Sequence, residues 1–202
     1  MIIRSASYIS SSTSLQQCPK SEKPEFGFIG RSNVGKSSLI NLLTGYSRLA
    51  KISGNPGKTK TINHFLINGS WYLVDLPGYG FAKVPLSMRD KWIGAVEEYI
   101  LNKETLACLF VLLDSRHQPQ KSDLLFMEFL GRNQIPFARV FTKSDKLSSD
   151  KLEKSIHIYN KEMIKIWESL PETFVVSVVN KTGREEVLGF IEETINKLSK
   201  PA

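Results

Sequence analysis

The stretch GRSNVGKSSLINLL, residues 30–43, decides the fold of this chain. Its glycines and lysine follow the spacing G-x-x-x-x-G-K-S from Gly30 to Ser37. The apolar run EFGFIG (25–30) predicts a strand before it, and a helical pattern follows as far as Gly45. A glycine-rich turn between a strand and a helix lets backbone N–H groups surround a phosphate. The stretch therefore predicts a phosphate-binding loop.

Each residue type in this loop suits one part of a bound polyphosphate. The Lys36 ammonium is expected to reach the β- and γ-phosphates, and the Ser37 hydroxyl is expected to coordinate Mg²⁺. A chance glycine turn with a surface lysine is the alternative, and the strand and helix that flank the loop argue against it. The loop predicts a nucleotide-binding set made of Gly30, Arg31, Ser32, Asn33, Val34, Gly35, Lys36, Ser37 and Ser38.

Length and composition favour one globular domain over residues 1–202. Of the 202 residues, 41% are hydrophobic, enough for a sizeable core. No apolar run reaches the length of about 18 residues that spans a bilayer, so we expect no membrane partner. Cys18 and Cys108 match no disulfide or metal-ligand spacing, and Cys108 lies in the apolar run LACLFVLL. We therefore expect a reducing, cytoplasmic setting.

The N-terminal residues allow two interpretations. The first 19 residues hold one arginine, six serines and no acid, which is typical of an organellar transit peptide. The segment IIRSASYI (2–9) favours instead a first strand followed by a polar loop. We expect the second arrangement, with residues 1–22 forming a strand and loop extension of the domain.

The net charge of +7 is concentrated around the phosphate-binding loop. Residues 26–65 contain no Asp or Glu. A basic region of this kind suits a polyphosphate, a nucleic-acid backbone, or both. Its cations are Arg31, Lys36, Arg48, Lys51, Lys58 and Lys60.

Short apolar runs alternate with helical patterns along the rest of the chain. A β-hairpin is expected from TINHFLI (61–67), the turn NGS and WYLVDL (71–76). The continuous apolar run at 106–114 is typical of a parallel strand buried on both faces. Helices are expected over 87–102, 120–131, 148–169 and 183–199, and strands over 135–142 and 173–179. This alternation predicts an α/β fold with a mostly parallel sheet of about six strands, one antiparallel pair and helices on both faces.

The segment Asp75-Leu76-Pro77-Gly78 follows a predicted strand. An acid at the end of a buried strand can hold Mg²⁺ through water, and the N–H of Gly78 can sense the γ-phosphate. Four residues alone are a weak signal. Placed after a phosphate-binding loop, they indicate the second half of a nucleotide site.

The segment Thr142-Lys143-Ser144-Asp145 ends another predicted strand. The Asp145 carboxylate can accept two hydrogen bonds from guanine, and adenine lacks that pair of donors. The stem of Lys143 is expected to lie over the base. An exposed turn with an N-cap aspartate is the alternative for these residues taken alone.

Together these segments resemble the EngB family (also called YihA or YsxC) of the TrmE-Era-EngA-EngB-Septin-like GTPases. The resemblance covers about residues 1–198. It implies a P-loop GTPase fold and a GTP-hydrolysing factor of large ribosomal subunit assembly that is needed for normal cell division. The segments that carry it are GRSNVGKSSLIN (30–41), PGKTKTINHF (56–65), DLPGYGFA (75–82), DSRHQPQKSD (114–123) and TKSD (142–145).

The resemblance also implies roles for two segments that carry little signal of their own. Residues 46–60 become a mobile first switch, in which Thr59 meets Mg²⁺ and the γ-phosphate and Thr61 is the local competitor. Residues 177–179 close over the guanine, although Val178 stands where many members have a second serine. These segments add Gly57, Lys58, Thr59, Lys60, Thr61, Val176, Ser177 and Val178 to the nucleotide-binding set.

Within that set, the expected catalytic groups are Lys36, Thr59 and Gly78. The expected Mg²⁺ ligands are Ser37, Thr59 and, through water, Asp75.

Several other residues have more than one interpretation. Asn33 occupies a position at which some related GTPases bind K⁺, or it only stabilises the turn. Tyr79 stands where many small GTPases place a water-orienting glutamine, which implies slow intrinsic hydrolysis. Tyr79 and Phe81 are also candidates for an effector surface. His64 suggests a general base, but its place in an alternating strand favours a packed or edge histidine.

The sequence therefore predicts a monomeric GTPase that binds GTP and GDP with Mg²⁺ and contacts the large ribosomal subunit or ribosomal RNA. Two alternatives stay open. One is a nucleotide-controlled RNA-binding or ribosome-binding module whose hydrolysis is incidental, and the other is a division-site scaffold. The basic region favours RNA over the scaffold.

Overall fold

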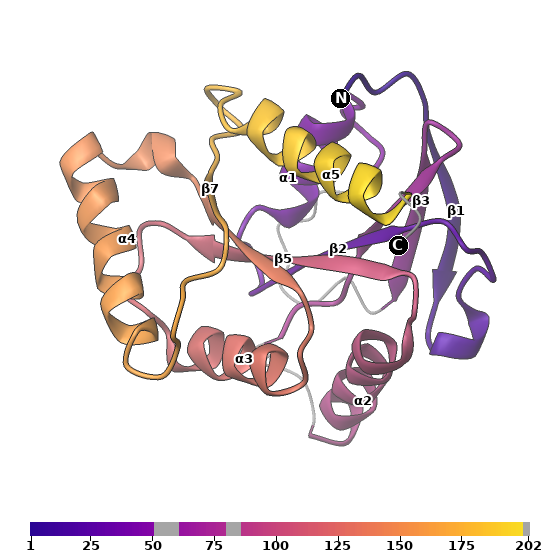
Figure 1. Cartoon of the computed structure of the whole chain (residues 1–202), viewed down its shortest axis with the longest axis horizontal. Helices are drawn as coiled ribbons and strands as arrows, with labels where there is room; N and C mark the ends of the chain where they lie inside the picture. Colours follow the sequence, from indigo (N-terminus) through magenta and orange to yellow (C-terminus); the bar gives the residue numbers. More distant parts are fainter. Residues whose placement is uncertain (51–60, 80–85, 200–202) are drawn as a thin grey trace.

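The computed structural model describes residues 1–50, 61–79 and 86–199, and only the backbone of 86–93. In these residues one sheet runs in the order β1-β3-β4-β2-β5-β6-β7 (Figure 1). The strands are β1 (Ala6–Ser12), β2 (Glu25–Gly30), β3 (Ile62–Ile67), β4 (Trp71–Asp75), β5 (Leu106–Asp114), β6 (Phe137–Thr142) and β7 (Thr173–Val175). The helices are α1 (Lys36–Thr44), α2 (Leu86–Asn102), α3 (Lys121–Arg132), α4 (Ser149–Met163) and α5 (Arg184–Leu198).

The central part of the sheet is parallel, as the sequence predicts. Strand β2 pairs in parallel with β4 on one side and with β5 on the other, and β6 and β7 continue the same direction. Every residue of β2 is buried, and most of β5 is buried as well. Because the strands are parallel, the loops that follow β2, β4, β5 and β6 emerge at one edge of the sheet.

The antiparallel part of the sheet includes one strand more than the predicted six. The expected hairpin forms between β3 and β4, and β1 adds a second antiparallel pairing along β3. This first strand, predicted over residues 2–9, forms over Ala6–Ser12 and so begins later than expected. The Asn68 side chain explains this start, because it accepts hydrogen bonds from the N–H groups of Arg4 (2.7 Å) and Ser5 (3.2 Å).

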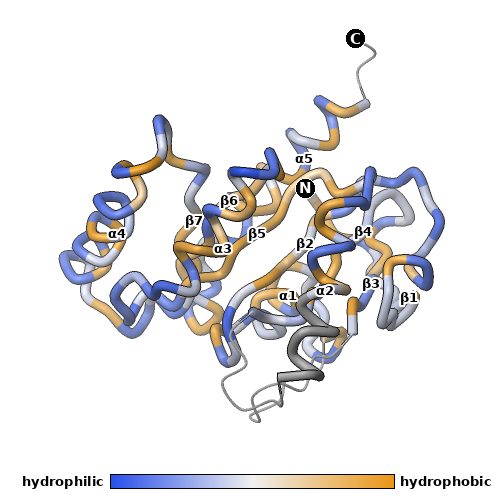
Figure 2. The backbone as a smooth tube through the Cα atoms, turned by 90° about the horizontal axis from the view of Figure 1, so that it is seen from below, coloured by the Kyte–Doolittle hydropathy of each residue, from blue (hydrophilic) through white to orange (hydrophobic). Residues whose placement is uncertain are grey.

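Two hydrophobic layers hold the helices on the sheet. Buried residues of α1 and α5 pack on one face, against residues such as Phe28 and Phe110. Buried residues of α2, α3 and α4 pack on the other face, against residues such as Ile29 and Val111. Figure 1 shows α1 and α5 opposite α2 and α3, and Figure 2 shows the hydrophobic residues concentrated along the central strands. Cys108 is buried in the first layer, as predicted.

Two predicted elements end earlier than expected. The helix predicted over 148–169 ends at Met163, and Ile166 is 65% exposed. Trp167 packs instead against Phe137 at 5.4 Å between ring centroids and lies directly on Gly131. Trp167 therefore contacts α3 and β6 from the segment beyond the end of α4.

The strand predicted over 173–179 also ends early, at Val175. Ser177 and Thr182 bond to each other through their backbones and form a turn there.

No helix in the described ranges, 1–50, 61–79 and 86–199, has the length and apolarity needed to cross a membrane. The histidine predicted to be packed, His64, is completely buried, with its ring against Tyr72 and Tyr99.

Candidate functional site

The predicted phosphate-binding loop lies between β2 and α1. Gly30 ends the strand, and a Cβ there would lie 2.8 Å from the carbonyl oxygen of Leu112, so only glycine fits. Asn33 (φ 63°) and Gly35 (φ 103°) take left-handed backbone conformations that curl the chain. Lys36, Ser37 and Ser38 form the first turn of α1, whose N–H groups face the loop.

Lys36 and Asp75 form an ion pair at the base of this loop. Asp75 is the last residue of β4, and its side chain is 7% exposed. The amide of Asn63 lies 3.5 Å from its second oxygen. Burial lowers the pKa of Lys36 to about 7, while the contact with Asp75 favours the charged ammonium. The pair brings together the two residues that the sequence assigns to the triphosphate and Mg²⁺.

The loop after β4 touches the phosphate-binding loop directly. Leu76 and Pro77 are buried, and a Cβ on Gly78 would lie 2.3 Å from the carbonyl oxygen of Gly30. Glycine at position 78 therefore permits the closest approach of the two loops.

Tyr79 does not form the exposed effector surface that the sequence suggests. Its ring stacks on Phe126 of α3 at 4.3 Å, and its hydroxyl is buried with no hydrogen-bond partner among the described residues. Burial, followed by the charge of Asp123, raises the pKa of Tyr79 well above its ordinary value. The ring turns to α3 because Phe126 and Phe129 offer an aromatic surface there. Phe81 lies outside the described residues.

The predicted base-binding segment, residues 142–145, lies beside the phosphate-binding loop. The Thr142 hydroxyl donates to the carbonyl oxygen of Val34 (2.7 Å), and the Lys143 ammonium donates to that of Asn33 (2.6 Å). Each bond crosses from the end of β6 to the loop after β2, so the two predicted motifs form one site.

Asp145 is held from the segment after β7. The Ser177 hydroxyl donates to its carboxylate at 2.8 Å, and this hydrogen bond lowers the pKa of Asp145. Val176 is buried, and Val178 is 37% exposed. The charged carboxylate that the sequence predicts to recognise guanine is thus held in place by a serine that only the resemblance identifies.

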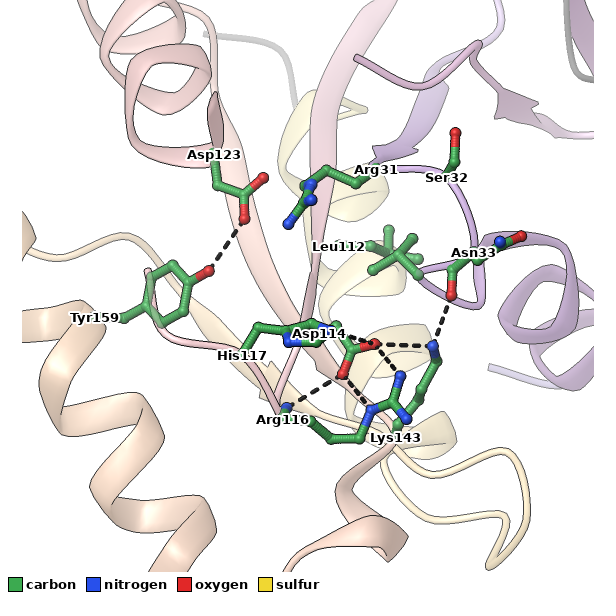
Figure 3. Close-up of a pocket in the computed structure, with 11 residues that line it drawn as sticks. Arg31, Ser32, Asn33, Leu112, Asp114, Arg116, His117, Asp123, Lys143 and Tyr159 are labelled. Atoms are coloured by element: carbon green, nitrogen blue, oxygen red, sulfur yellow. Dashed lines mark hydrogen bonds and ion pairs between the residues drawn. The ribbon is translucent and has the colours of Figure 1, made fainter. Parts of the chain in front are cut away.

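A cavity of about 140 Å³ lies between the phosphate-binding loop, the end of β5 and α4. Figure 3 shows its side chains: Lys143 lies between Asp114 and the Asn33 carbonyl, and Arg31 points toward Asp123. Asp123 is 3% exposed, and one of its oxygens accepts a hydrogen bond from Tyr159 (3.1 Å). Burial raises the pKa of Asp123 despite that bond.

Asp114 also lines this cavity and contacts Lys143 of the predicted nucleotide-binding set. The sequence did not predict this contact. Its signal is visible in the sequence, because an acid closes the apolar run 106–114 at a strand end. The contact itself depends on β5 and β6 being neighbours. Asp123 belongs to the segment that carries the resemblance, yet nothing local assigns it a partner.

Some of the predicted site residues lie outside the part of the chain that the structure describes, and others have contacts of another kind. Gly57, Lys58, Thr59 and Lys60 lie outside the described residues. Thr61 is described, and its hydroxyl donates to the Asn63 side chain at 2.9 Å. Trp71 is buried and Trp167 packs in the α3–α4 region, whereas the side chain of Trp92 lies outside the described part.

The oxygen donors at this site suit a Mg²⁺ ion that also binds water and phosphate, rather than a metal held by protein side chains alone. A hydroxyl at Ser37 and a buried carboxylate at Asp75 are hard oxygen donors, which Mg²⁺ prefers together with water and phosphate oxygens. Within residues 1–50, 61–79 and 86–199, no group of three or more His, Cys, Asp or Glu side chains could hold a metal.

The phosphate-binding loop, the acid that ends β4 and the base-binding segment thus meet at one edge of a parallel sheet. This arrangement defines a P-loop GTPase. The family model described as "50S ribosome-binding GTPase" matches residues 25–143.

Full-length relatives and solved structures agree with that class. Proteins called "Probable GTP-binding protein EngB" are 51% identical in Porphyromonas gingivalis and 52% identical in Bacteroides thetaiotaomicron, over 98–99% of this chain and 99% of each relative. The crystal structure of a probable GTP-binding protein engB matches with a TM-score of 0.69 and 23% identity, over 86% of this chain and 99% of that one. The chain belongs to the EngB family of GTP-binding proteins, and it is a GTPase.

Proposed function

We propose that this GTPase binds GTP and GDP with Mg²⁺, hydrolyses GTP slowly and acts as a nucleotide-controlled factor in assembly of the large ribosomal subunit in the cytoplasm. The proposal extends to a requirement in normal cell division. The observation that carries the nucleotide part is the junction of Lys143 and Asn33, because it joins the base-binding segment to the phosphate-binding loop.

Guanine selectivity is supported by the geometry at Asp145. The carboxylate is charged, 7% exposed and anchored by Ser177, so it offers two acceptor oxygens at fixed positions. A base without two matching donors would leave this acid unpaired, which costs binding free energy.

Mg²⁺ would be held by Ser37, by Asp75 through water, and by Thr59. When bound, the ion neutralises negative charge on the β- and γ-phosphates. Lys36 would then contact the phosphates instead of pairing with Asp75. The chain's own contribution to the reaction is to orient the triphosphate for in-line attack of water.

Slow hydrolysis is supported by the position of Tyr79. Its ring is packed on Phe126 and its hydroxyl is buried, so this side chain does not point toward an attacking water. The same observation favours the second candidate function, a nucleotide-controlled ribosome-binding module whose hydrolysis is incidental. Single-turnover hydrolysis with and without large subunits separates the two, since a rate that subunits do not change favours the module.

A K⁺ ion at Asn33 remains part of the proposal. In the structure the Asn33 carbonyl bonds to Lys143, and Figure 3 shows its side-chain amide directed away from that contact. The test is hydrolysis after exchange of Na⁺ for K⁺ at constant ionic strength. K⁺ should accelerate the parent and not Asn33→Gly, whereas equal rates leave only the turn-stabilising role.

The ribosomal part is supported by the family description and by the basic region 26–65. Era, whose solved complex contains MgGDPNP and nucleotides 1506–1542 of 16S ribosomal RNA, shares this fold with a TM-score of 0.66, 19% identity and coverage of 85% of this chain and 56% of that one.

Co-sedimentation with large subunits tests the ribosomal part. We expect tighter binding with a non-hydrolysable GTP analogue than with GDP, and a steeper log–log salt dependence in the GTP-like state. Replacing Lys51, Lys58 and Lys60 with alanine should flatten that dependence, because fewer phosphates are then contacted. The matched control replaces three exposed lysines of α4, which are Lys151, Lys154 and Lys161. Equal binding by the triple variant and the parent in both nucleotide states would place the ribosomal contact elsewhere.

A further inference from the structure

The register of the sheet places Asp114 beside the base-binding segment. Asp114 is the last residue of β5, and it pairs in parallel register with Thr142, the last residue of β6. The residue that follows Thr142 is Lys143, whose backbone is left-handed (φ 59°). This conformation turns the lysine side chain back across the edge of the sheet, toward Asp114 and the phosphate-binding loop (Figure 3).

The Lys143 ammonium is held from two sides. It donates to the carboxylate of Asp114 at 2.8 Å and to the carbonyl oxygen of Asn33 at 2.6 Å. Asn33 is itself left-handed (φ 63°), a conformation that costs a non-glycine residue free energy. One ammonium thus connects the loops after β2, β5 and β6, and it stabilises the curled backbone of the phosphate-binding loop.

Asp114 is held in turn by its own loop. Arg116 donates from Nε to one oxygen (2.8 Å) and from Nη2 to the other (2.8 Å). The Asp114 side chain is 12% exposed, whereas Arg116 is 41% exposed. Burial raises the pKa of Asp114, but hydrogen bonds from Arg116 and Lys143 outweigh this effect and bring it well below its ordinary value. The carboxylate is therefore charged whenever the protein is folded near neutral pH.

We propose that Asp114 is a positioning residue for nucleotide binding, which holds the Lys143 ammonium against the Asn33 carbonyl and so forms the junction of the base-binding and phosphate-binding loops before the nucleotide arrives. The proposal rests on the guanine-nucleotide site proposed above and adds a third loop to it. The aspartate acts through the lysine and needs no contact with the nucleotide. Loss of its charge releases the ammonium, so part of the binding free energy must then be spent on ordering Lys143.

A double-mutant cycle tests this role. Asp114→Asn keeps the size of the side chain and removes its charge, and Lys143→Met keeps most of the aliphatic stem and removes the ammonium. Calorimetric titration with GDP should show binding about tenfold weaker for Asp114→Asn, as expected for one charge-assisted hydrogen bond. In the Lys143→Met background the same change should alter the Kd by less than about twofold, because the coupling partner is absent.

Two further measurements separate positioning from a structural role. The ratio of GDP to xanthosine diphosphate affinity should stay as in the parent, whereas Asp145→Asn should shift it toward xanthine. In Asp114→Glu, which keeps the carboxylate, the GDP Kd should recover toward the parent value, a rescue that a merely structural role would not give. Asp150→Asn, an exposed aspartate on α4, is the matched control and should bind GDP like the parent. Should Asp114→Asn not fold, Asp114→Ser, which also removes the charge, serves the same cycle.

A GDP Kd for Asp114→Asn within twofold of the parent's overturns the proposal. An equal loss in the parent and Lys143→Met backgrounds also overturns it, because the carboxylate then acts through another group. Failure of the guanine assignment looks different. A parent that binds ADP as tightly as GDP contradicts base selectivity, while the coupling between positions 114 and 143 is still measured with either nucleotide.

Discussion

The charged residues that gather around the two ends of strand β2 have opposite uses. At its start, Glu25 is completely buried and both its oxygens are occupied. His64 Nε2 lies 3.2 Å from one oxygen and Tyr99 donates to the same atom, while Thr105 (2.9 Å) donates to the other, with Lys103 3.1 Å from it. These groups come from β3, α2, the α2–β5 connection and β2, so the cluster fastens the elements together.

Around the other end of the same strand, the charged side chains have protein partners but can still bind a ligand. Lys36 and Asp75 pair mainly with each other, and both are residues that a triphosphate and Mg²⁺ would engage. Lys143 and Asp145 are likewise anchored by two protein groups each, which leaves capacity for a ligand. A fully satisfied buried charge stabilises the fold, whereas a partly satisfied one at a loop is available for binding. The predictions below test this contrast.

The largest expected effect is on stability, at the start of β2. Glu25→Ala should lower the free energy of unfolding by about 3–5 kcal/mol, because it leaves the buried groups of its partners without their acceptor. Chemical denaturation measures it, with exposed Glu22→Ala as the control. GDP affinity of the folded fraction should not change. A loss below about 1 kcal/mol would show that the cluster contributes little to stability.

At the opposite end, Lys36→Ala should weaken GTP binding by about 3 kcal/mol or roughly a hundredfold, since a charged phosphate contact is lost. The fold should persist, as judged by circular dichroism, because the lysine serves the ligand and not the core. Calorimetric titration gives the affinity, and exposed Lys151→Ala is the control. Parent-like GTP affinity would remove Lys36 from the site.

The base-binding segment should respond in specificity as well as in affinity. Asp145→Asn is expected to cost about 2–4 kcal/mol of GTP binding, because the charged acceptor of two donors is lost. Xanthine nucleotides should gain relative to GTP. Competition titrations with both nucleotides measure the change. Equal binding of ATP and GTP by the parent would refute the role of Asp145.

The pH dependence of stability should report Glu25. Burial raises its pKa, but hydrogen bonds from His64 and Tyr99 and the charge of Lys103 lower it further, so the folded-state pKa lies below the ordinary value. Its contribution is therefore fully present above the unfolded pKa of about 4.3 and is lost as the pH falls through the folded value. Thermal unfolding of the parent and Glu25→Gln should converge in acid. A difference that persists unchanged in acid would contradict this linkage.

The smallest expected effect is on stability and concerns Asp123, which lies at neither end of β2. Asp123 on α3 is buried, and one of its oxygens has no partner among the described residues. Burial raises its folded pKa, so the charged form costs stability above the unfolded pKa of about 3.9. Asp123→Asn should raise the free energy of unfolding at pH 7 by about 1 kcal/mol, because an amide replaces a partly paired buried charge.

The gain of Asp123→Asn should disappear below pH 4, where both states of the parent are protonated. Exposed Asp150→Asn is the control. Destabilisation at pH 7 would mean that Arg31 and Tyr159 already compensate the charge of Asp123.

Local patterns in the sequence were enough for the fold class and for placing the phosphate-binding-loop segment between a strand and a helix. The glycine spacing from Gly30 to Lys36 needs only a preceding strand and a following helix, and both are encoded by nearby apolar residues. The hairpin at 61–76 was equally predictable, because Asn68 and Gly69 take the positive φ values that its turn requires. The base-binding role of residues 142–145 rests on a short motif at a strand end.

Only the tertiary structure decided which remote segments meet. Asp114 reaches Lys143 because β5 and β6 are neighbours in register, and Tyr79 turns to Phe126 because α3 lies beside the loop after β4. Trp167, beyond the end of α4, likewise contacts residues of α3 and β6 that are remote in the sequence. The sequence by itself determined the conformations that neighbouring residues impose on each other. Contacts across the sheet depend on strand order and register, which no local pattern contains.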